Sequence, residues 1–361
     1  MIWVLLSILI VSLLLNQLFL KRNIMSFRYY LEPSTFQAEI GDVIEIHSVV
    51  ENHKKLPVSY VELVERYPEG LGSSEYRTSL YVEGFERVKR RHQVTALKRG
   101  LHRIENGRLI IGDFLGFHRE YRRYPLNKEW VVYPEKIRLN EHVRPMDSTL
   151  GELSVRRWIL PDLMMIRGVR EYTGVEAQRS IHWPSSLRQG RLMVREYDYT
   201  ADQACLVLLN IQTSRPTWEK PRADLIESTI RLTRALAEEL EASSIPFGLW
   251  SNAYNHVDPS QRGYVVHEGL GDAHMQEILD VLGRIDYKVG PGFPTLLRQV
   301  QLQAMSQVTI VMLTPRLLDG YLEEIRYLAA RVSRLVIFTQ TDELIQHLPG
   351  NVEVYLGVTH D

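Results

Sequence analysis

The sequence predicts a chain of mixed class: an N-terminal transmembrane helix, an all-β domain of sandwich type, and an α/β domain with a doubly wound, mainly parallel sheet. Three observations support this prediction. Residues 1–20 are almost continuously apolar, residues 29–140 contain short strands of alternating polarity, and residues 201–361 alternate apolar strands with amphipathic helices. Residues 141–200 fit neither pattern, and we expect a connector and an arginine-rich segment there.

The apolar segment at residues 1–20 carries no charged side chain and is long enough to cross a bilayer core of ~30 Å as a helix. A cleaved signal peptide is disfavoured, because no basic residue precedes the apolar run and Leu18–Leu20 offers no small-residue cleavage site. Lys21, Arg22 and Arg28 follow, and basic residues stay on the cytoplasmic side of a membrane. We therefore expect a single-pass protein of the cell membrane, anchored in the lipid bilayer and with cytoplasmic domains.

Composition and charge limit the functional classes. The chain has 43 Lys and Arg against 44 Asp and Glu, so its bulk charge does not predict nucleic-acid binding. Basic residues are concentrated in residues 87–123, where they face either anionic lipid or solvent, and the sequence leaves both interpretations open. The lone cysteine, Cys205, lies in an apolar run, which is typical of a buried thiol in a reducing compartment rather than of a nucleophile.

The segment from residue 29 to residue 140 is predicted to be all-β. In the run 43–50, Ile44 and Ile46 fall on one face of a strand, and Glu45 falls on the other. Further short runs are separated by turn dipeptides, and they are 58–64, 76–82, 85–97, 108–111 and 130–133. Several short strands at this spacing are typical of a sandwich of roughly 100 residues.

From residue 201 onward, strands and helices are predicted to alternate. The runs 204–209 and 308–313 are continuously apolar, as expected for parallel strands that are buried on both faces. Shorter strands are expected at 245–250 and 334–338, and helices at 221–242, 273–283, 295–305, 317–331 and 342–348. This alternation predicts a parallel sheet that is covered by helices on both faces.

The arginine-rich segment, residues 166–199, is expected to be an ordered junction that docks one domain onto another. Guanidinium groups need carboxylates, carbonyls or ring faces as partners, so such a segment is costly to place in an ordinary loop. The residues that we expect to form the interaction surface of this segment are Arg170, Glu171, Tyr172, Arg179, Trp183 and Arg195.

Three stretches of the chain form a recognisable set, and they are Leu97–Arg103 with Ile111–Phe117, Trp130–Pro134, and Arg170–Tyr172 with Ile181–Trp183 and Leu192–Glu196. This set resembles bacterial proteins of the domain-of-unknown-function family numbered fifty-eight. The resemblance implies a von Willebrand factor A-like fold for residues 201–361 and a partnership with a MoxR-type AAA+ ATPase. Two positions depart from the family pattern: Gly174-Val175-Glu176 stands for a Gly-Asp-Asp, and His182 stands for an aspartate.

The resemblance also defines a candidate metal site. Von Willebrand factor A domains often hold Mg²⁺ through D-x-S-x-S, a threonine and a later aspartate. The matching positions here are Asn210, Gln212, Ser214, Thr295 and Thr314. Both aspartates are thus replaced by neutral side chains, whereas a divalent cation of this kind needs carboxylate oxygen ligands. We therefore predict a degenerate site, with no metal and no cofactor.

The leading hypothesis is a membrane-anchored, non-enzymatic adaptor that works with the MoxR-type ATPase and contacts no nucleic acid. One alternative is a metal-dependent ligand-binding domain that uses Ser214 and Thr295. A second alternative is a cytoplasmic hydrolase that uses His182 and Ser185, although the sequence has no G-x-S-x-G nucleophile elbow. The leading hypothesis assigns no catalytic residue.

Overall fold

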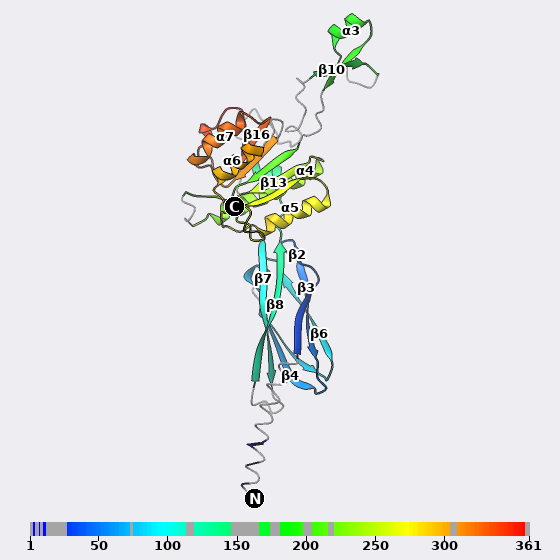
Figure 1. Cartoon of the computed structure of the whole chain (residues 1–361), viewed down its shortest axis with the longest axis vertical. Coiled ribbons are helices and arrows are strands. Elements are labelled where there is room, and N and C mark those ends of the chain that lie inside the picture. Colours follow the sequence, from blue (N-terminus) through cyan, green and yellow to red (C-terminus); the bar gives the residue numbers. More distant parts are fainter. Residues whose placement is uncertain are drawn as a thin grey trace. The chain divides into compact units, whose positions relative to one another are not determined.

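A computed structural model gives the structure of the chain (Figure 1). The residues that it describes are 27–72, 75–112, 119–145, 166–173, 181–197, 204–215, 220–303 and 309–357, with Trp3, Ser7, Ile10 and Val11. The chain divides into two compact units. The first contains Met1–Glu135 and Leu279–Asp286, and the second contains Lys136–Ile278 and Tyr287–Asp361.

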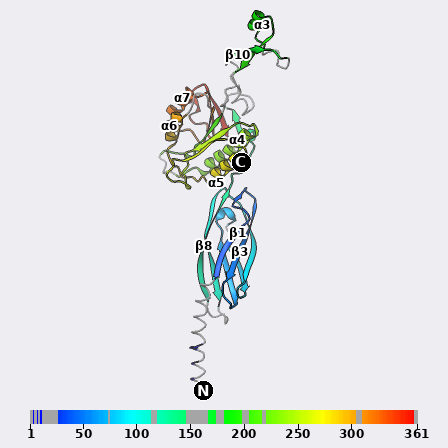
Figure 2. The ribbon, with the colours of Figure 1, turned by 45° about the vertical axis from the view of Figure 1, so that its right-hand side comes forward.

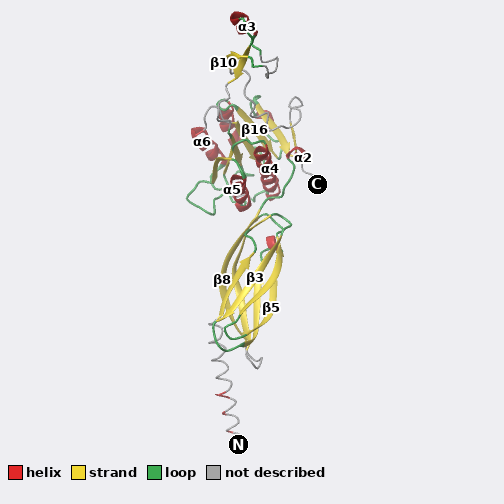
Figure 3. Cartoon of the chain, turned by 90° about the vertical axis from the view of Figure 1, so that its right-hand side faces the viewer, coloured by secondary structure: helices red, strands yellow, loops and turns green. Residues whose placement is uncertain are grey.

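The described strands of the first unit form two sheets around one apolar core (Figure 3). The strand orders are β1-β3-β6 and β2-β8-β7-β4-β5. The bounds are β1 Phe27–Pro33, β2 Gln37–Ala38, β3 Val43–Asn52, β4 Val58–Arg66, β5 Glu75–Val82, β6 Arg87–Thr95, β7 Gly100–Gly112 and β8 Arg119–Val132, with a short 3₁₀ helix η1 at Glu69–Leu71. On β3, Ile44 and Ile46 are fully buried while Glu45 is half-buried, as the alternation of polarity predicts.

A buried carboxylate links the two sheets of the first unit. Glu65 on β4 is fully buried, and its Oε1 accepts hydrogen bonds from the hydroxyls of Tyr29 and Ser48, both at 2.5 Å. Its Oε2 accepts one from Tyr67 at 2.6 Å and lies 3.2 Å from His92 Nε2. Burial alone raises the pKa of Glu65, but hydrogen bonds from His92 and the three hydroxyls outweigh it and hold this pKa below its ordinary value. Glu65 is therefore ionised at neutral pH, and its bonds fix the sheets together.

The second unit contains a sheet with the strand order β14-β13-β12-β15-β16-β17-β9. The bounds are β9 Val143–Pro145, β12 Cys205–Leu209, β13 Phe247–Ser251, β14 Tyr264–Gly269, β15 Thr309–Thr314, β16 Arg334–Thr339 and β17 Val352–Gly357. The five inner strands, β13, β12, β15, β16 and β17, run parallel to one another. The two edge strands, β14 and β9, pair antiparallel with their neighbours. The middle strands are almost wholly buried, which explains their continuous apolar sequences.

Helices cover both faces of this sheet. Figures 1 and 2 show α6 and α7 on one side and α4 and α5 on the other. The bounds are α2 Leu139–His142, α4 Ala223–Ala242, α5 Asp272–Arg284, α6 Phe293–Gln303, η4 Asp319–Tyr321, α7 Leu322–Ala329 and η5 Ile345–His347. α6 and α7 share a core with Leu208 on β12, Ile310 on β15 and Ile337 on β16. Leu206 and Trp250 lie at the margin of this core and are only half-buried.

The predicted fold class is wrong about the sheet. We expected a mainly parallel, doubly wound arrangement, but the described part of the chain is mostly strand and forms several sheets, and the largest sheet is mixed. β14 follows β13 without an intervening helix and pairs with it antiparallel, whereas the crossover between parallel neighbours usually contains a helix. β9 comes from the predicted connector and pairs antiparallel with β17.

The predicted transmembrane helix, and with it the single-pass membrane localisation, is also corrected. Most of residues 1–20 lie outside the described residues. Among the residues that the structure does describe, no helix is both long enough and apolar enough to cross a membrane.

Candidate functional site

Polar side chains meet where the central strands of the second unit end. Asn210 follows β12, Asn252 follows β13 and Thr314 ends β15, and parallel strands place their carboxyl ends at one edge. Asn210 Nδ2 donates to Thr314 Oγ1 at 2.8 Å. Asn210 Oδ1 accepts from Asn252 Nδ2 at 2.8 Å and from the Gln212 main-chain N–H at 2.9 Å. All four residues are buried, and we call this group the strand-end network.

The strand-end network continues toward α6. Gln212 Oε1 accepts from the N–H of Phe293 at 3.1 Å, and Gln212 Nε2 donates to the Ser214 carbonyl oxygen at 3.0 Å. Thr314 Oγ1 donates to the Arg316 carbonyl oxygen at 2.7 Å. Buried amides and hydroxyls are stable only when they are hydrogen-bonded, and here their partners are neutral groups of the chain itself.

The structure brings together the side chains of three of the five residues of the predicted degenerate metal site, namely Asn210, Gln212 and Thr314, and Ser214 contacts Gln212 through its carbonyl oxygen. Thr295 lies farther along α6, and its N–H donates to the Gly292 carbonyl oxygen at 2.9 Å. No group of three or more His, Cys, Asp or Glu side chains that could hold a metal ion occurs among the described residues. The donor set is thus amide and hydroxyl rather than carboxylate, which does not fit Mg²⁺.

Asn252 also belongs to the strand-end network, although the sequence patterns did not predict it. Its Oδ1 accepts from the Ile211 main-chain N–H at 2.9 Å, so the residue ties the end of β13 to the segment after β12. A polar residue directly after the buried strand Phe247–Ser251 was the available signal.

The arginine-rich segment forms two antiparallel strands with a helix between them. The bounds are β10 Ile166–Glu171, α3 Trp183–Gln189 and β11 Met193–Tyr197. Glu171 is paired with Arg191 at 3.0 Å, and Arg170 donates to the Glu171 carbonyl oxygen at 3.1 Å. Trp183 and Leu187, one turn apart on α3, are 60% and 83% exposed. The described part of the segment therefore carries two exposed apolar side chains on α3.

The remaining predicted signature residues are only partly described. The main-chain N–H of Tyr172 donates to the Leu192 carbonyl oxygen at 2.9 Å, next to the β10–β11 pair. Arg179 and the Gly174-Val175-Glu176 departure lie outside the described residues, and so does the side chain of Arg195.

His182 and Ser185 meet as a helix cap. His182 Nδ1 lies 2.8 Å from Ser185 Oγ and also accepts the Ser185 main-chain N–H at 3.3 Å, at the start of α3. A nucleophilic serine needs a base whose other ring nitrogen is oriented by a third group. No described residue forms a hydrogen bond with His182 Nε2. This contact is therefore better explained as capping than as a catalytic pair.

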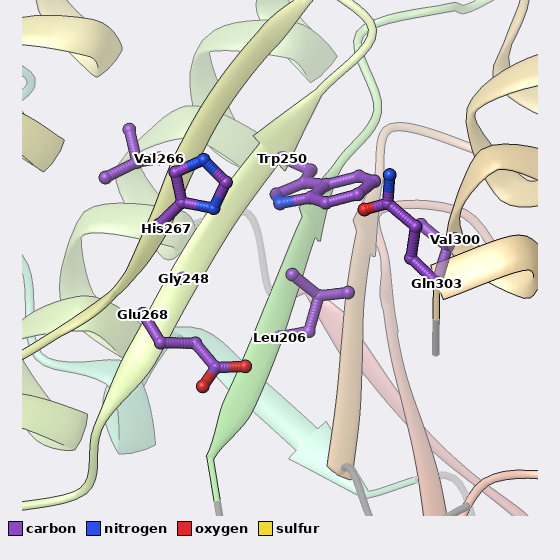
Figure 4. Close-up of a pocket in the computed structure, with 8 residues that line it drawn as sticks. All are labelled: Leu206, Gly248, Trp250, Val266, His267, Glu268, Val300 and Gln303. Atoms are coloured by element: carbon purple, nitrogen blue, oxygen red, sulfur yellow. The ribbon is translucent and has the colours of Figure 1, made fainter. Parts of the chain in front are cut away.

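A groove lies beside the edge strand β14, on the face of the sheet that carries α6. It consists of two cavities, of about 330 and 360 Å³, which share Trp250, His267 and Gln303. Leu206, Gly248, Val266, Glu268 and Val300 also line the first cavity (Figure 4), and Arg262, Val265, Gln299 and Leu302 also line the second.

A β-bulge shapes the first cavity. Leu206 pairs with Gly248 on the neighbouring strand, and β14 places two residues, His267 and Glu268, opposite Gly248. A Cβ atom at Gly248 would lie 2.9 Å from the Val266 carbonyl oxygen, so the bulge needs a glycine there. A bulge breaks the strict alternation of faces, which allows both His267 and Glu268 to line the groove. In Figure 4 the Glu268 carboxylate points across Gly248 toward Leu206.

Comparisons with known proteins give limited similarity. No family model matches the chain. An uncharacterised protein of Bacillus subtilis (strain 168), YeaD, is 20% identical over 262 residues, which cover 70% of this chain and 61% of that protein. The chain thus spans less than two thirds of the length of this relative. The solved CARDB domain of the PF1109 protein of Pyrococcus furiosus, in complex with di-metal ions, covers 28% of this chain and 90% of that domain, at 8% identity and a TM-score of 0.21. Neither similarity assigns the chain to a family or an activity.

Proposed function

We propose that this chain is a non-enzymatic interaction protein that works with a MoxR-type AAA+ ATPase, by recruiting the ATPase or by presenting a substrate to it. The identity of the partner rests on the sequence motifs that resemble domain-of-unknown-function family fifty-eight. The non-enzymatic part rests on one observation, the strand-end network. At the edge where open α/β sheets usually hold ligands, Asn210, Asn252 and Thr314 are buried and bonded to one another.

The metal-dependent alternative finds little support at this edge. A divalent cation would have to replace hydrogen bonds that Asn210 and Gln212 already make, and it would gain no carboxylate in exchange. Activity through contact with other proteins needs no such exchange, because it uses side chains that are exposed in the free chain. Trp183 and Leu187 on α3 are side chains of this kind.

The test is a binding experiment with purified full-length chain and a purified MoxR-type ATPase from the same organism. The chain is immobilised, and retention of the ATPase is measured with ATP, with ADP and without nucleotide. We expect a complex whose amount depends on the nucleotide. Replacing both Trp183 and Leu187 by alanine should reduce retention at least about tenfold if hot-spot residues lie on α3.

The matched control is Val257→Ala, because Val257 is an exposed apolar side chain of the same unit at 66% exposure but lies far along the chain from α3. This variant should retain the ATPase as the natural chain does. Absence of a complex in all three nucleotide states would contradict the proposed function.

A further inference from the structure

We propose that the groove beside β14 binds a basic side chain, lysine or arginine, from an extended segment of a partner protein, with the cation held between the Trp250 indole and the Glu268 carboxylate. This inference rests on the proposed function only in expecting a protein partner. Trp250 and Glu268 line the same cavity, and Gly248 separates them without filling the space with a side chain.

The chemistry of the first cavity matches an organic cation. An indole face attracts ammonium and guanidinium groups more strongly than the other aromatic rings do. The apolar side chain of Leu206, which is only half-buried, would cover the aliphatic stem of a lysine or arginine, which packs well on apolar surface while its charged end reaches a carboxylate.

The charge of Glu268 is available for a ligand. Two other carboxylates of the second unit are paired with arginines: Glu238 with Arg234 at 2.9 Å, and Glu353 with Arg334 at 2.6 Å. Glu268 is exposed, and it forms no hydrogen bond or ion pair with any residue that the structure describes. The bulge opposite Gly248 therefore directs an unpaired carboxylate into a cavity that contains an indole ring.

The second cavity favours a polypeptide over a small free cation. It extends the groove past Trp250 and is lined by Val265 and Leu302, of which Leu302 is 87% exposed. The amides of Gln299 and Gln303 lie along the same groove and can pair with peptide groups. An extended segment would thus place its basic side chain in the first cavity and an apolar side chain in the second.

Arg262 affects which side chains the second cavity would accept. Arg262 lines the second cavity but not the first, and Glu268 lines the first but not the second. A second basic side chain there would be repelled, whereas an acidic one would be attracted. We therefore expect a segment with one basic residue, followed or preceded by an apolar and then an acidic residue.

The test uses ¹⁵N-labelled full-length chain and two capped pentapeptides, Gly-Leu-Lys-Leu-Gly and the same sequence with norleucine in place of lysine. The readout is the indole N–H signal of Trp250, assigned with the variant Trp250→Phe. We expect the lysine peptide to shift this signal at millimolar concentrations, as suits a contact of a few kcal/mol. The norleucine peptide should bind at least about tenfold more weakly.

Two variants with equal changes of charge make the test specific. Glu268→Gln should weaken binding of the lysine peptide about tenfold. Asp342→Asn removes an exposed carboxylate elsewhere in the same unit, and it should leave binding unchanged. Putrescine serves as a free diamine, and it should bind more weakly than the lysine peptide.

Several results would overturn the inference: no shift of the Trp250 signal up to about 10 mM lysine peptide, equal binding of both peptides, an unchanged affinity in Glu268→Gln, or tighter binding of putrescine. These results are separate from those that bear on the proposed function. Peptide binding without an ATPase complex would support the inference about the groove and contradict the proposed function. An ATPase complex without peptide binding would support the proposed function and contradict the inference about the groove.

Discussion

Replacement of Asn210 by aspartate tests whether the strand-end network is a neutral hydrogen-bonded cluster or a cation site. The two side chains have the same shape, so the change creates no cavity. Asn210 Nδ2 donates to Thr314 Oγ1 at 2.8 Å and to the Gln212 carbonyl oxygen at 3.4 Å. In the variant an acceptor oxygen occupies this position and faces the same two oxygens.

The expected loss of stability follows from these contacts. One good hydrogen bond and one long one are lost, at about 1 kcal/mol for the first, and a buried charge is left without a cationic partner. We expect Asn210→Asp to lower the free energy of unfolding of the second unit by about 3 kcal/mol at pH 7. Burial should raise the pKa of the new carboxyl above its unfolded value of about 3.9. The deficit is then complete above the folded pKa and shrinks as the pH falls through it, because a protonated carboxyl can donate to Thr314 again.

The assay is calorimetry of the full chain at pH 7 and at about pH 5, with and without Mg²⁺. Asn210→Ala is the control for charge: it removes the bonds of both side-chain atoms but adds no titratable group, so its deficit should be equal at both pH values. An aspartate variant as stable as the natural chain would refute the reasoning. So would recovery of more than about 1 kcal/mol by Mg²⁺, because that recovery would show that the strand ends can hold a divalent cation.

Three further predictions concern other parts of the chain. Glu65→Gln should destabilise the first unit by about 2–4 kcal/mol at neutral pH, because an amide offers one acceptor oxygen to groups that now share two. The pKa of Glu65 is lower in the folded chain than in the unfolded chain, so the ionised carboxylate stabilises the fold at pH values above its unfolded pKa. This stabilisation disappears as the pH falls through the folded pKa. Calorimetric scans below about pH 4 should therefore show a smaller difference in stability between Glu65→Gln and the natural chain. Gly248→Val should displace the bulge of β14, because the new side chain would collide with the Val266 carbonyl oxygen. The amide chemical shifts of His267 and Glu268 should change, and the lysine peptide should no longer bind. Unchanged chemical shifts would count against the role of the bulge. Burial raises the pKa of the Cys205 thiol, so Cys205 should resist a thiol reagent in the native chain at about pH 8 and react after unfolding; rapid native reaction would contradict its burial.

Local sequence patterns were sufficient to predict strands in which burial is strong and regular. The continuous apolar run 204–209 and the alternation at Ile44 and Ile46 each report a strand whose surroundings are uniform along its length. The edge strand Tyr264–Gly269 was missed because its bulge puts His267 and Glu268 in succession and breaks the period of two. The edge strand Val143–Pro145 is too short to carry a period, and only its pairing with β17 makes it a strand.

Among the residues of the candidate sites, too, some could be proposed from the sequence and others depend on contacts between distant strands. Asn210, Gln212 and Thr314 could be proposed from sequence because the resemblance supplied their positions. For Asn252 the sequence offers only its place after a buried strand, and its bond to Asn210 depends on the parallel register of β12 and β13 across 42 positions of sequence. The cluster around Glu65 is equally non-local, since Tyr29 and Ser48 come from other strands, and only Tyr67 is close in sequence.

The two candidate sites of the second unit differ in burial and in charge. At the strand ends the polar groups are buried, neutral and mutually bonded, so this edge contributes stability but little electrostatic attraction for a ligand. At β14 the strand turns back antiparallel, and its bulge opposite Gly248 exposes the Glu268 carboxylate beside Trp250. Recognition by charge is therefore expected at the side of the sheet rather than at its strand ends. A partner selected in this way would be distinguished by the charge of its side chains, and its binding should weaken as salt screens the exposed carboxylate.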